Sequence, residues 1–317
     1  MNFDDIELTL LSEGKIFGNR HNSKLEAIKN YGTKAAITDL CILTGSYLCT
    51  DINYNIPEDN GLKGRTSWFW TTTYNYGNDV RVVNRDGAKN QVRQIFKRTG
   101  AIRPVLKSPT IFSLVFLHRV IGYNGTEEVE YGEYPQYAPD SKMQSILDAE
   151  YHSGLKKTGN SYTFDSVKYD NSSTPFTPNI CHEYEYLGKK YIRIMANTFY
   201  NQGKFTLSNG ETYQFGDYVW VEVLPVKWLI DYKEKLLISK FGLVSGIRFL
   251  DKGTEYRGDF DKTEMKEYLD KYMLHDLLQS VKYTRIEDMT AEERKQLEEA
   301  RKELEKRRNP YGFNTNN

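Results

Sequence analysis

The hydrophobic and polar positions of the first hundred residues predict short strands separated by polar turns. Residues 35–43 form an apolar run that ends before Gly45, and we expect it to supply one or two buried strands. Residues 68–73 (WFWTTT) combine aromatic and β-branched side chains, which favour strands. Another strand is expected at 79–84, followed by Asp86-Gly87, a favoured hairpin turn. The pattern therefore predicts an antiparallel meander.

The second half of the chain mixes helical and strand patterns. Apolar side chains recur at helical spacing over 141–155, which predicts a helix, whereas the apolar run 111–120 fits either a strand or a helix. Leu187-Gly188-Lys189 lies between two tyrosine-containing runs and predicts a hairpin. Residues 218–223 alternate like a half-buried strand, and we expect Pro225 to separate them from the next apolar run.

Two helices are expected at the C-terminal end. Residues 261–264 resemble a capping box with Asp261 as the cap, and the apolar stripe that follows them predicts a helix docked on the core. Residues 290–293 form a second capping box, but the helix behind it is charged nearly all round. It fits a solvated helix or a peg that docks on another copy or a partner, and residues 309–317 are expected to fray.

Charge and composition exclude several classes of protein. The chain has 317 residues with 43 Lys+Arg against 43 Asp+Glu, and this balance argues against nucleic acid as the main partner. Its longest apolar runs fall short of the roughly 20 residues that span a bilayer, so no membrane span is expected. The acidic start, Met1 to Asp5, lacks the features of a secretion signal, and we expect the protein to stay in the cytosol or to leave it inside a virion.

Aromatic content is the unusual feature of the composition. The chain has 24 Tyr, 15 Phe and 4 Trp, whereas disordered chains are poor in aromatic residues. Surfaces rich in Tyr, Asn, Ser and Gly are suited to adaptable recognition. Composition therefore predicts a globular, β-rich chain that acts in binding.

Several segments resemble bacterial and phage domains of the DUF6273 type, which look like relatives of the C-type-lectin-like and formylglycine-generating-enzyme folds. Residues 68–72, 78–83 and 102–105 are similar to the closing section of those domains. Residues 131–136, 225–229 and 236–240, with the helix at 261–273, are similar to their opening section. The order of the two sections is thus reversed in this chain.

The resemblance implies an α+β fold: a C-type-lectin-like twisted antiparallel sheet with flanking helices, circularly permuted. Residues 1–285 would form this domain, with the closing section in 1–110 and the opening section in 128–285. Residues 286–317 would add a charged helix and a frayed tail. One permuted domain is favoured, because permutation is tolerated where chain termini lie close together. Two incomplete units side by side are the alternative.

The usual enzymatic and metal signatures do not emerge from the sequence. Cys41 and Cys49 match no copper-binding cysteine pair of the formylglycine-generating kind, and three cysteines are too few for a disulfide framework. Asn78-Asp79 only faintly resembles a lectin calcium element. Glu183 and Glu185 share a strand face, as solvated charges commonly do. No catalytic residue, metal or cofactor is expected.

The meander carries the strongest candidate for a site, because it concentrates aromatic side chains with Asn and Arg, the composition of a paratope. The similar strip of lectin-like proteins from diversity-generating retroelements is also rich in Asn and Tyr. Trp68 and Trp70 share a strand face, which favours a place in the core for both, with ligand contact as the alternative. The residues expected to contact a ligand are Trp70, Tyr74, Tyr76, Asn78, Asp79, Arg81, Asn84, Arg85, Asn90 and Arg93.

We therefore expect a non-enzymatic binding protein that presents this hairpin surface to a protein or glycan ligand. A phage or mobile-element origin fits best, with the protein acting as a virion fibre, decoration or receptor-binding component. The alternatives are an intracellular phage inhibitor of a host defence protein and an oxidase of the formylglycine-generating type. Direct nucleic-acid binding through the meander arginines is disfavoured, and a homo-oligomer is left open.

Overall fold

The computed structural model describes most of the chain up to residue 281. The described residues are 6–18, 23–29, 32–56, 63–89, 91–108, 119–121, 127–166, 174–197, 203–231, 233–281, 290–292, 294, 295, 298, 299 and 302. Within them, mostly antiparallel strands combine with a few helices, which confirms the α+β class. None of their helices is long and apolar enough to cross a bilayer.

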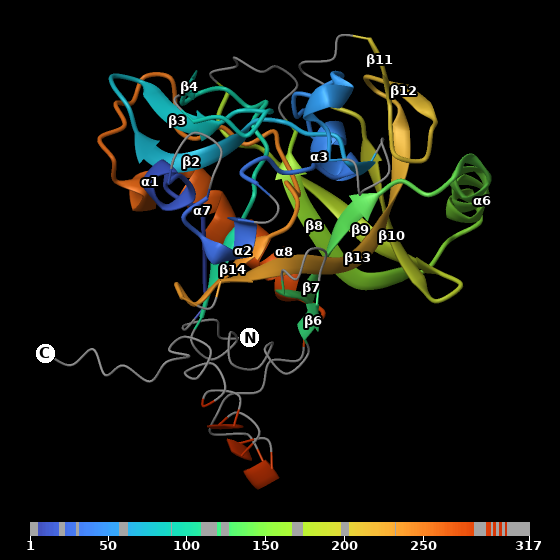
Figure 1. Ribbon diagram of the computed structural model, residues 1–317. Coiled ribbons are helices and arrows are strands. Elements are labelled where there is room, and N and C mark those ends of the chain that lie inside the picture. The colour runs from blue at the N-terminus through green and yellow to red at the C-terminus, as the bar shows by residue number, and fades with distance from the viewer. Residues whose placement is uncertain are drawn as a thin grey trace, which may run out of the picture.

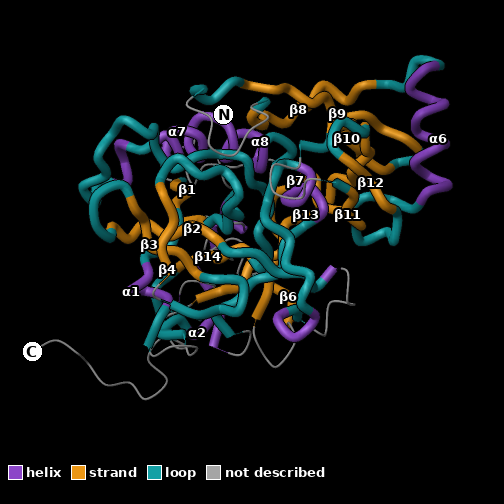
Figure 2. Tube along the Cα trace, turned by 90° about the horizontal axis from the view of Figure 1, so that it is seen from above, coloured by secondary structure: helices purple, strands orange, loops and turns teal. Residues whose placement is uncertain are grey.

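One large antiparallel sheet organises the molecule (Figures 1 and 2). In the order β1-β5-β14-β13-β10-β9-β8, with β7 on β13 and β6 on β7, its strands are β1 (Glu7–Thr9), β5 (Val105–Lys107), β14 (Leu236–Ser239), β13 (Tyr218–Asp231), β10 (Lys189–Met195), β9 (Pro178–Tyr186), β8 (Lys157–Asp165), β7 (Glu127–Tyr137) and β6 (Arg119–Ile121). Strands from the first hundred residues and from the second half therefore lie in the same sheet, and their apolar side chains share one core.

Short helices surround the sheet. They are α1 (Glu13–Ile16), α2 (Glu26–Lys29), α3 (Asp39–Leu43), the 3-10 turns Ile52–Tyr54 and Phe260–Lys262, α6 (Ser141–His152), α7 (Glu264–Tyr268), a π-helical turn (Leu269–Met273) and α8 (Leu274–Leu278). The predicted helix over 141–155 is confirmed as α6, which covers an aromatic cluster of Tyr184, Tyr191 and Trp220. In Figure 1 it lies on the right-hand side of the molecule.

The predicted meander is confirmed as a separate three-stranded sheet of β2 (Phe69–Tyr74), β3 (Asp79–Val83) and β4 (Gln91–Gln94). It lies on the opposite side of the molecule from α6 (Figure 1). A second small sheet pairs β11 (Lys204–Thr206) with β12 (Thr212–Gln214). The hairpin predicted at residues 187–189 is also confirmed, since Leu187 and Gly188 join β9 to β10 with φ of 49° and 76°.

The prediction of strands over residues 35–43 was wrong for its second half. Ala36 and Ile37 make only isolated bridges, and residues 39–43 form helix α3. The Thr38 hydroxyl caps this helix by accepting a hydrogen bond from the Cys41 amide at 3.2 Å. A short apolar run is compatible with either state, and here the capping hydroxyl favours the helix.

Pro225 does not separate two strands as expected. β13 runs through it, with register shifts against β7 on both sides of the proline that absorb the missing amide donor. The side-chain amide of Gln136 then donates to the carbonyls of Leu224 and Pro225 at 3.0 and 2.9 Å. The bulged strand thus keeps its polar groups bonded.

The C-terminal helix docks on the core as predicted, but its cap differs. Thr263 rather than Asp261 accepts from the amide of Lys266, at 3.1 Å, while Asp261 lies in the preceding 3-10 turn. α7, the π-helical turn and α8 follow without a break and bury Met265 and Leu277 completely. Most of residues 111–120 and 286–317 lies outside the described residues; of the latter, those described from 291 onward are helical.

Candidate functional site

A hollow of about 380 Å³ lies beside the β3–β4 turn of the meander. We call it the meander pocket. Its lining residues are Tyr47, Trp68, Asn84, Arg85, Gln91, Arg93, Lys97 and Thr99. Three of the residues predicted to contact a ligand, Asn84, Arg85 and Arg93, thus line one hollow. The volume falls in the range of sites for small ligands, about 300–1,000 Å³.

The turn between β3 and β4 positions Asn84 and Arg85. Gly87 closes this turn, with its amide donating to the Asn84 carbonyl at 2.9 Å and a φ of +81° that favours glycine. The Thr33 hydroxyl donates to the Gly87 carbonyl, and a Cβ at Gly87 would lie 2.6 Å from that hydroxyl oxygen. The turn is therefore held against the segment around Thr33 by a contact that only glycine allows.

Strand register brings Gln91 and Arg93 to the pocket. Gln91 pairs with Val82 and Arg93 pairs with Val80, so both polar side chains share one face of the meander. Arg81 pairs with Val92 on the alternate positions and contacts Glu13, with 3.5 Å between Nε and the carboxylate. Arg81 and Arg93, which the sequence placed on one surface, therefore lie on opposite faces of the meander.

Aromatic rings hold the two pocket arginines. The Arg85 guanidinium lies 5.5 Å from the ring centres of both Tyr47 and Tyr54 and donates to the Tyr47 hydroxyl. The Arg93 guanidinium lies 5.4 Å from the ring centre of Trp68 and donates to the Val92 carbonyl at 2.8 Å. Cation–π contacts of this kind fix the side chains while leaving their charge in place.

The charge of the pocket is one-sided. Arg85, Arg93 and Lys97 contribute three cations, and none of the described lining residues is acidic. The nearest acid along the chain, Asp86, instead accepts a hydrogen bond from the Ala88 amide at 3.0 Å. A concave surface with cations of one sign raises the local concentration of anions. The arrangement is chemically suited to hold an anionic group.

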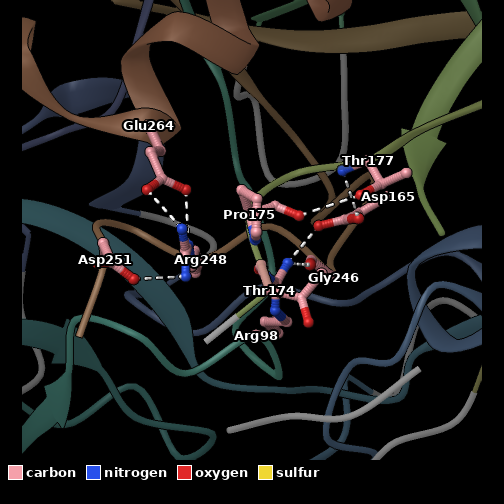
Figure 3. Close-up of polar contacts among 9 residues, drawn as sticks. All are labelled: Arg98, Asp165, Thr174, Pro175, Thr177, Gly246, Arg248, Asp251 and Glu264. Atoms are coloured by element: carbon pink, nitrogen blue, oxygen red, sulfur yellow. Dashed lines mark hydrogen bonds and ion pairs between the residues drawn. The ribbon is translucent and has the colours of Figure 1, made fainter. Parts of the chain in front are cut away.

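The wall that carries Lys97 and Thr99 is anchored by the residue between them. Arg98 is fully buried and pairs with Asp165, which is itself 1% exposed (Figure 3). The guanidinium also donates to the carbonyls of Gly246 and Thr174 at 3.1 and 2.6 Å. Burial lowers the pKa of Arg98, and the Asp165 carboxylate opposes that shift.

A second ion-pair group, centred on Arg248, lies nearby (Figure 3). The positive charge of Arg248 also lowers the pKa of Arg98. Arg248 forms a bidentate pair with Glu264, at 2.6 and 2.8 Å, and a further pair with Asp251 at 2.7 Å. Because bidentate geometry fixes both partners, this pair ties the loop after β14 to the start of α7.

The other predicted ligand contacts lie apart from the pocket. Trp70 is 1% exposed and packs between Trp68 and Phe249, so it occupies the core position that the sequence left open. Tyr74 and Tyr76 are 36% and 83% exposed at the β2–β3 turn, which is the other end of the meander. Asn78 is exposed and Asp79 half-buried beside them, while Asn90 lies outside the described residues.

The sequence did not assign five of the lining residues to the site: Tyr47, Trp68, Gln91, Lys97 and Thr99. Tyr47 comes from the segment after α3, and only the tertiary fold brings it to Arg85. Gln91 could have been found, because it alternates with Arg93 along β4 and a strand places such residues on one face. Thr99 carries no local signal of its own.

The three cysteines and Glu183 do not line the pocket, and all four are buried. Cys41, Cys49 and Cys181 are free and buried, and burial raises the pKa of both Cys41 and Cys181 to about 12. Glu183, expected as a solvated charge, is instead fully buried and accepts hydrogen bonds from Thr158, Asn160 and Tyr162. No group of three or more His, Cys, Asp or Glu side chains suited to a metal ion occurs in the described part of the chain.

Comparison of the chain with protein-family models, with curated proteins and with solved structures gave no match.

Proposed function

We propose that this is a non-enzymatic binding protein whose meander pocket receives part of a protein or glycan ligand. The observation that carries the proposal is the convergence of Arg85 and Arg93, each held by aromatic rings, on one hollow of about 380 Å³. Aromatic and arginine side chains in a partly buried hollow are typical of the residues that dominate binding energy.

We further propose that the domain is a permuted relative of the C-type-lectin-like fold. The reversed order of the two similar sections supports this, and so does the sharing of one sheet by β5 from the first section and β14 from the second. The proposal predicts that the chain would still fold if its present ends were joined and it were opened between the two sections, which restores the order found in the similar domains. Each section would then keep its sheet partners.

A virion fibre, decoration or receptor-binding component is the biological setting we favour, with an intracellular inhibitor of a host protein as the alternative. Light-scattering mass separates them. A stable trimer or larger ring supports the virion component, whereas a monomer that retains one host protein at equal stoichiometry supports the inhibitor. The oxidase has less support, because a thiol with the raised pKa of Cys41 is not a ready metal ligand or nucleophile.

The test of the proposed function is binding to arrays of glycans and cell-surface proteins by the full chain and two variants. Arg93→Gln should lose the captured ligand. Arg257→Gln removes the same charge from an exposed side chain at a distance from the pocket and should keep the ligand. Equal binding by both variants, or chemical turnover of the ligand, would contradict a non-enzymatic site in the meander pocket.

A further inference from the structure

The polar groups of the meander pocket are of two kinds, and each kind points to a part of a ligand. Arg85, Arg93 and Lys97 are cations that only donate hydrogen bonds, and they match a carboxylate or phosphate. Asn84, Gln91 and Thr99 carry amides and a hydroxyl, which both donate and accept. Groups that donate and accept are matched by the hydroxyls of a sugar rather than by a bare anion.

The rings of Tyr47 and Trp68 add an apolar wall to this polar set. Trp68 is held edge to face against Trp70 at 4.8 Å between ring centres and is only 4% exposed, so its exposed part is fixed in place. The guanidinium groups of Arg93 and Arg85 lie over the rings of Trp68 and Tyr47, so this wall orients the two cations toward the hollow. The hollow is also of a size for a small ligand rather than for an extended chain.

We propose that the meander pocket binds an acidic saccharide, with the acidic group on Arg85 and Arg93 and the ring hydroxyls on Asn84 and Gln91. This inference rests on the proposed function and names the chemistry of its ligand. Binding then depends on salt, because the cations lie in a half-exposed hollow where added ions screen them. The charge of the sugar, more than its ring configuration, decides which saccharides bind.

The experiment is calorimetric and ligand-detected NMR titration of the full chain with matched sugars. The acidic probes are galacturonate, glucuronate, N-acetylneuraminate and galactose 6-phosphate, and the neutral probes are galactose and glucose. Inorganic phosphate and an acidic peptide of glutamates test the bare anion and the peptide. At least one acidic sugar is expected to bind at least about tenfold more tightly than its neutral parent, the effect of one charge-assisted hydrogen bond.

Variants locate the binding. Arg85→Gln and Arg93→Gln should each weaken binding of the acidic sugar by about tenfold or more and leave the melting temperature close to that of the unmodified chain. Arg257→Gln is the matched control and should bind as the unmodified chain does. A complex with any of the four acidic sugars whose affinity falls as salt rises, and that is lost in both pocket variants, supports the inference.

Three results would overturn it. Binding of neutral and acidic sugars with equal affinity would retain the pocket as a binding site but remove the acidic ligand. Tighter binding of the glutamate peptide or of inorganic phosphate than of every acidic sugar would show a peptide or anion site. Absence of binding by all acidic sugars at 10 mM would refute the inference, while array binding that still requires Arg93 would leave the proposed function standing.

Discussion

The buried pair of Arg98 and Asp165 offers the sharpest test of how the pocket is held. Both side chains are almost completely removed from water, at 0% and 1% exposure. In Asp165→Asn the amide oxygen still accepts from the Thr177 amide, which lies 3.1 Å from the carboxylate. The amide nitrogen then takes the place of the oxygen that accepts from Arg98, so the buried guanidinium loses both its counterion and one hydrogen-bond acceptor.

The expected cost follows from that unbalanced charge. Removal of one partner of a buried ion pair costs about 3–5 kcal/mol in the free energy of unfolding. The two carbonyls that accept from Arg98 soften the loss but carry no full charge. Arg98→Met together with Asp165→Leu removes both charges and should recover part of the stability, although those carbonyls then lack a donor.

Urea unfolding at pH 7 measures the effect, with Glu255→Gln as the control. Glu255 pairs with Arg257 at 2.8 Å, but both side chains are exposed, at 54% and 81%, and exposed pairs contribute little. A loss in Asp165→Asn that is no larger than in the control would refute the reasoning. Because Lys97 and Thr99 flank Arg98, the variant is also expected to weaken ligand binding at the meander pocket.

Three further changes test other parts of the structure. Burial raises the pKa of Asp276 to about 7, so between pH 4 and 7 the folded chain holds a proton that the unfolded chain has released. The free energy of unfolding therefore falls as pH rises from 4 to 7, by up to about 4 kcal/mol. Asp276→Asn should flatten that profile in urea titrations at several pH values. Asp39→Ala leaves the amides of Ala138 and Ser208 without their two acceptor oxygens and should cost about 2–4 kcal/mol, more than Asp39→Asn, which keeps an acceptor for one of the two amides. Gly87→Ala should destabilise by about 1–3 kcal/mol because its Cβ meets Thr33, and it should also weaken ligand binding.

Each of these has a result that contradicts it. A pH profile of Asp276→Asn parallel to that of the unmodified chain would remove the buried proton. A loss of less than about 1 kcal/mol in Asp39→Ala would show that acceptance of hydrogen bonds is not what matters there. Gly77→Ala is the control for Gly87, since Gly77 also has a positive φ, +60°, but its Cβ would meet nothing within 4 Å; equal losses in the two would contradict the close contact.

The meander could be predicted from the sequence because neighbouring residues determine its strands and its turn. Residues 68–74 carry β-prone side chains, and Asp86-Gly87 marks the turn, so both strands and their order follow from neighbouring residues. The same locality explains the failure at residues 39–43. An apolar run of five residues is compatible with a strand or with a buried helix, and here the Thr38 hydroxyl favours the helix by capping it.

The site was predictable only in part, for a geometric reason. The sequence placed Arg81, Arg85 and Arg93 in one surface, but alternation along β3 turns Arg81 to the other face. The register of β4 against β3 depends on the conformation of the turn between them, which the length of the turn alone does not fix. The contact of Tyr47 with Arg85 joins residues 38 positions apart, and no local pattern announces such a contact.

The most direct test of the meander pocket as a binding site is to observe where a ligand binds. Nitrogen-15 NMR spectra resolve the indole N–H of Trp68 and the Nε–H of Arg85 and Arg93, and they can be recorded as the tightest acidic saccharide is added. We expect these three signals to shift together and to saturate with the affinity measured by calorimetry. Unchanged signals from all three, or shifts confined to Tyr76 and the far end of the meander, would contradict it.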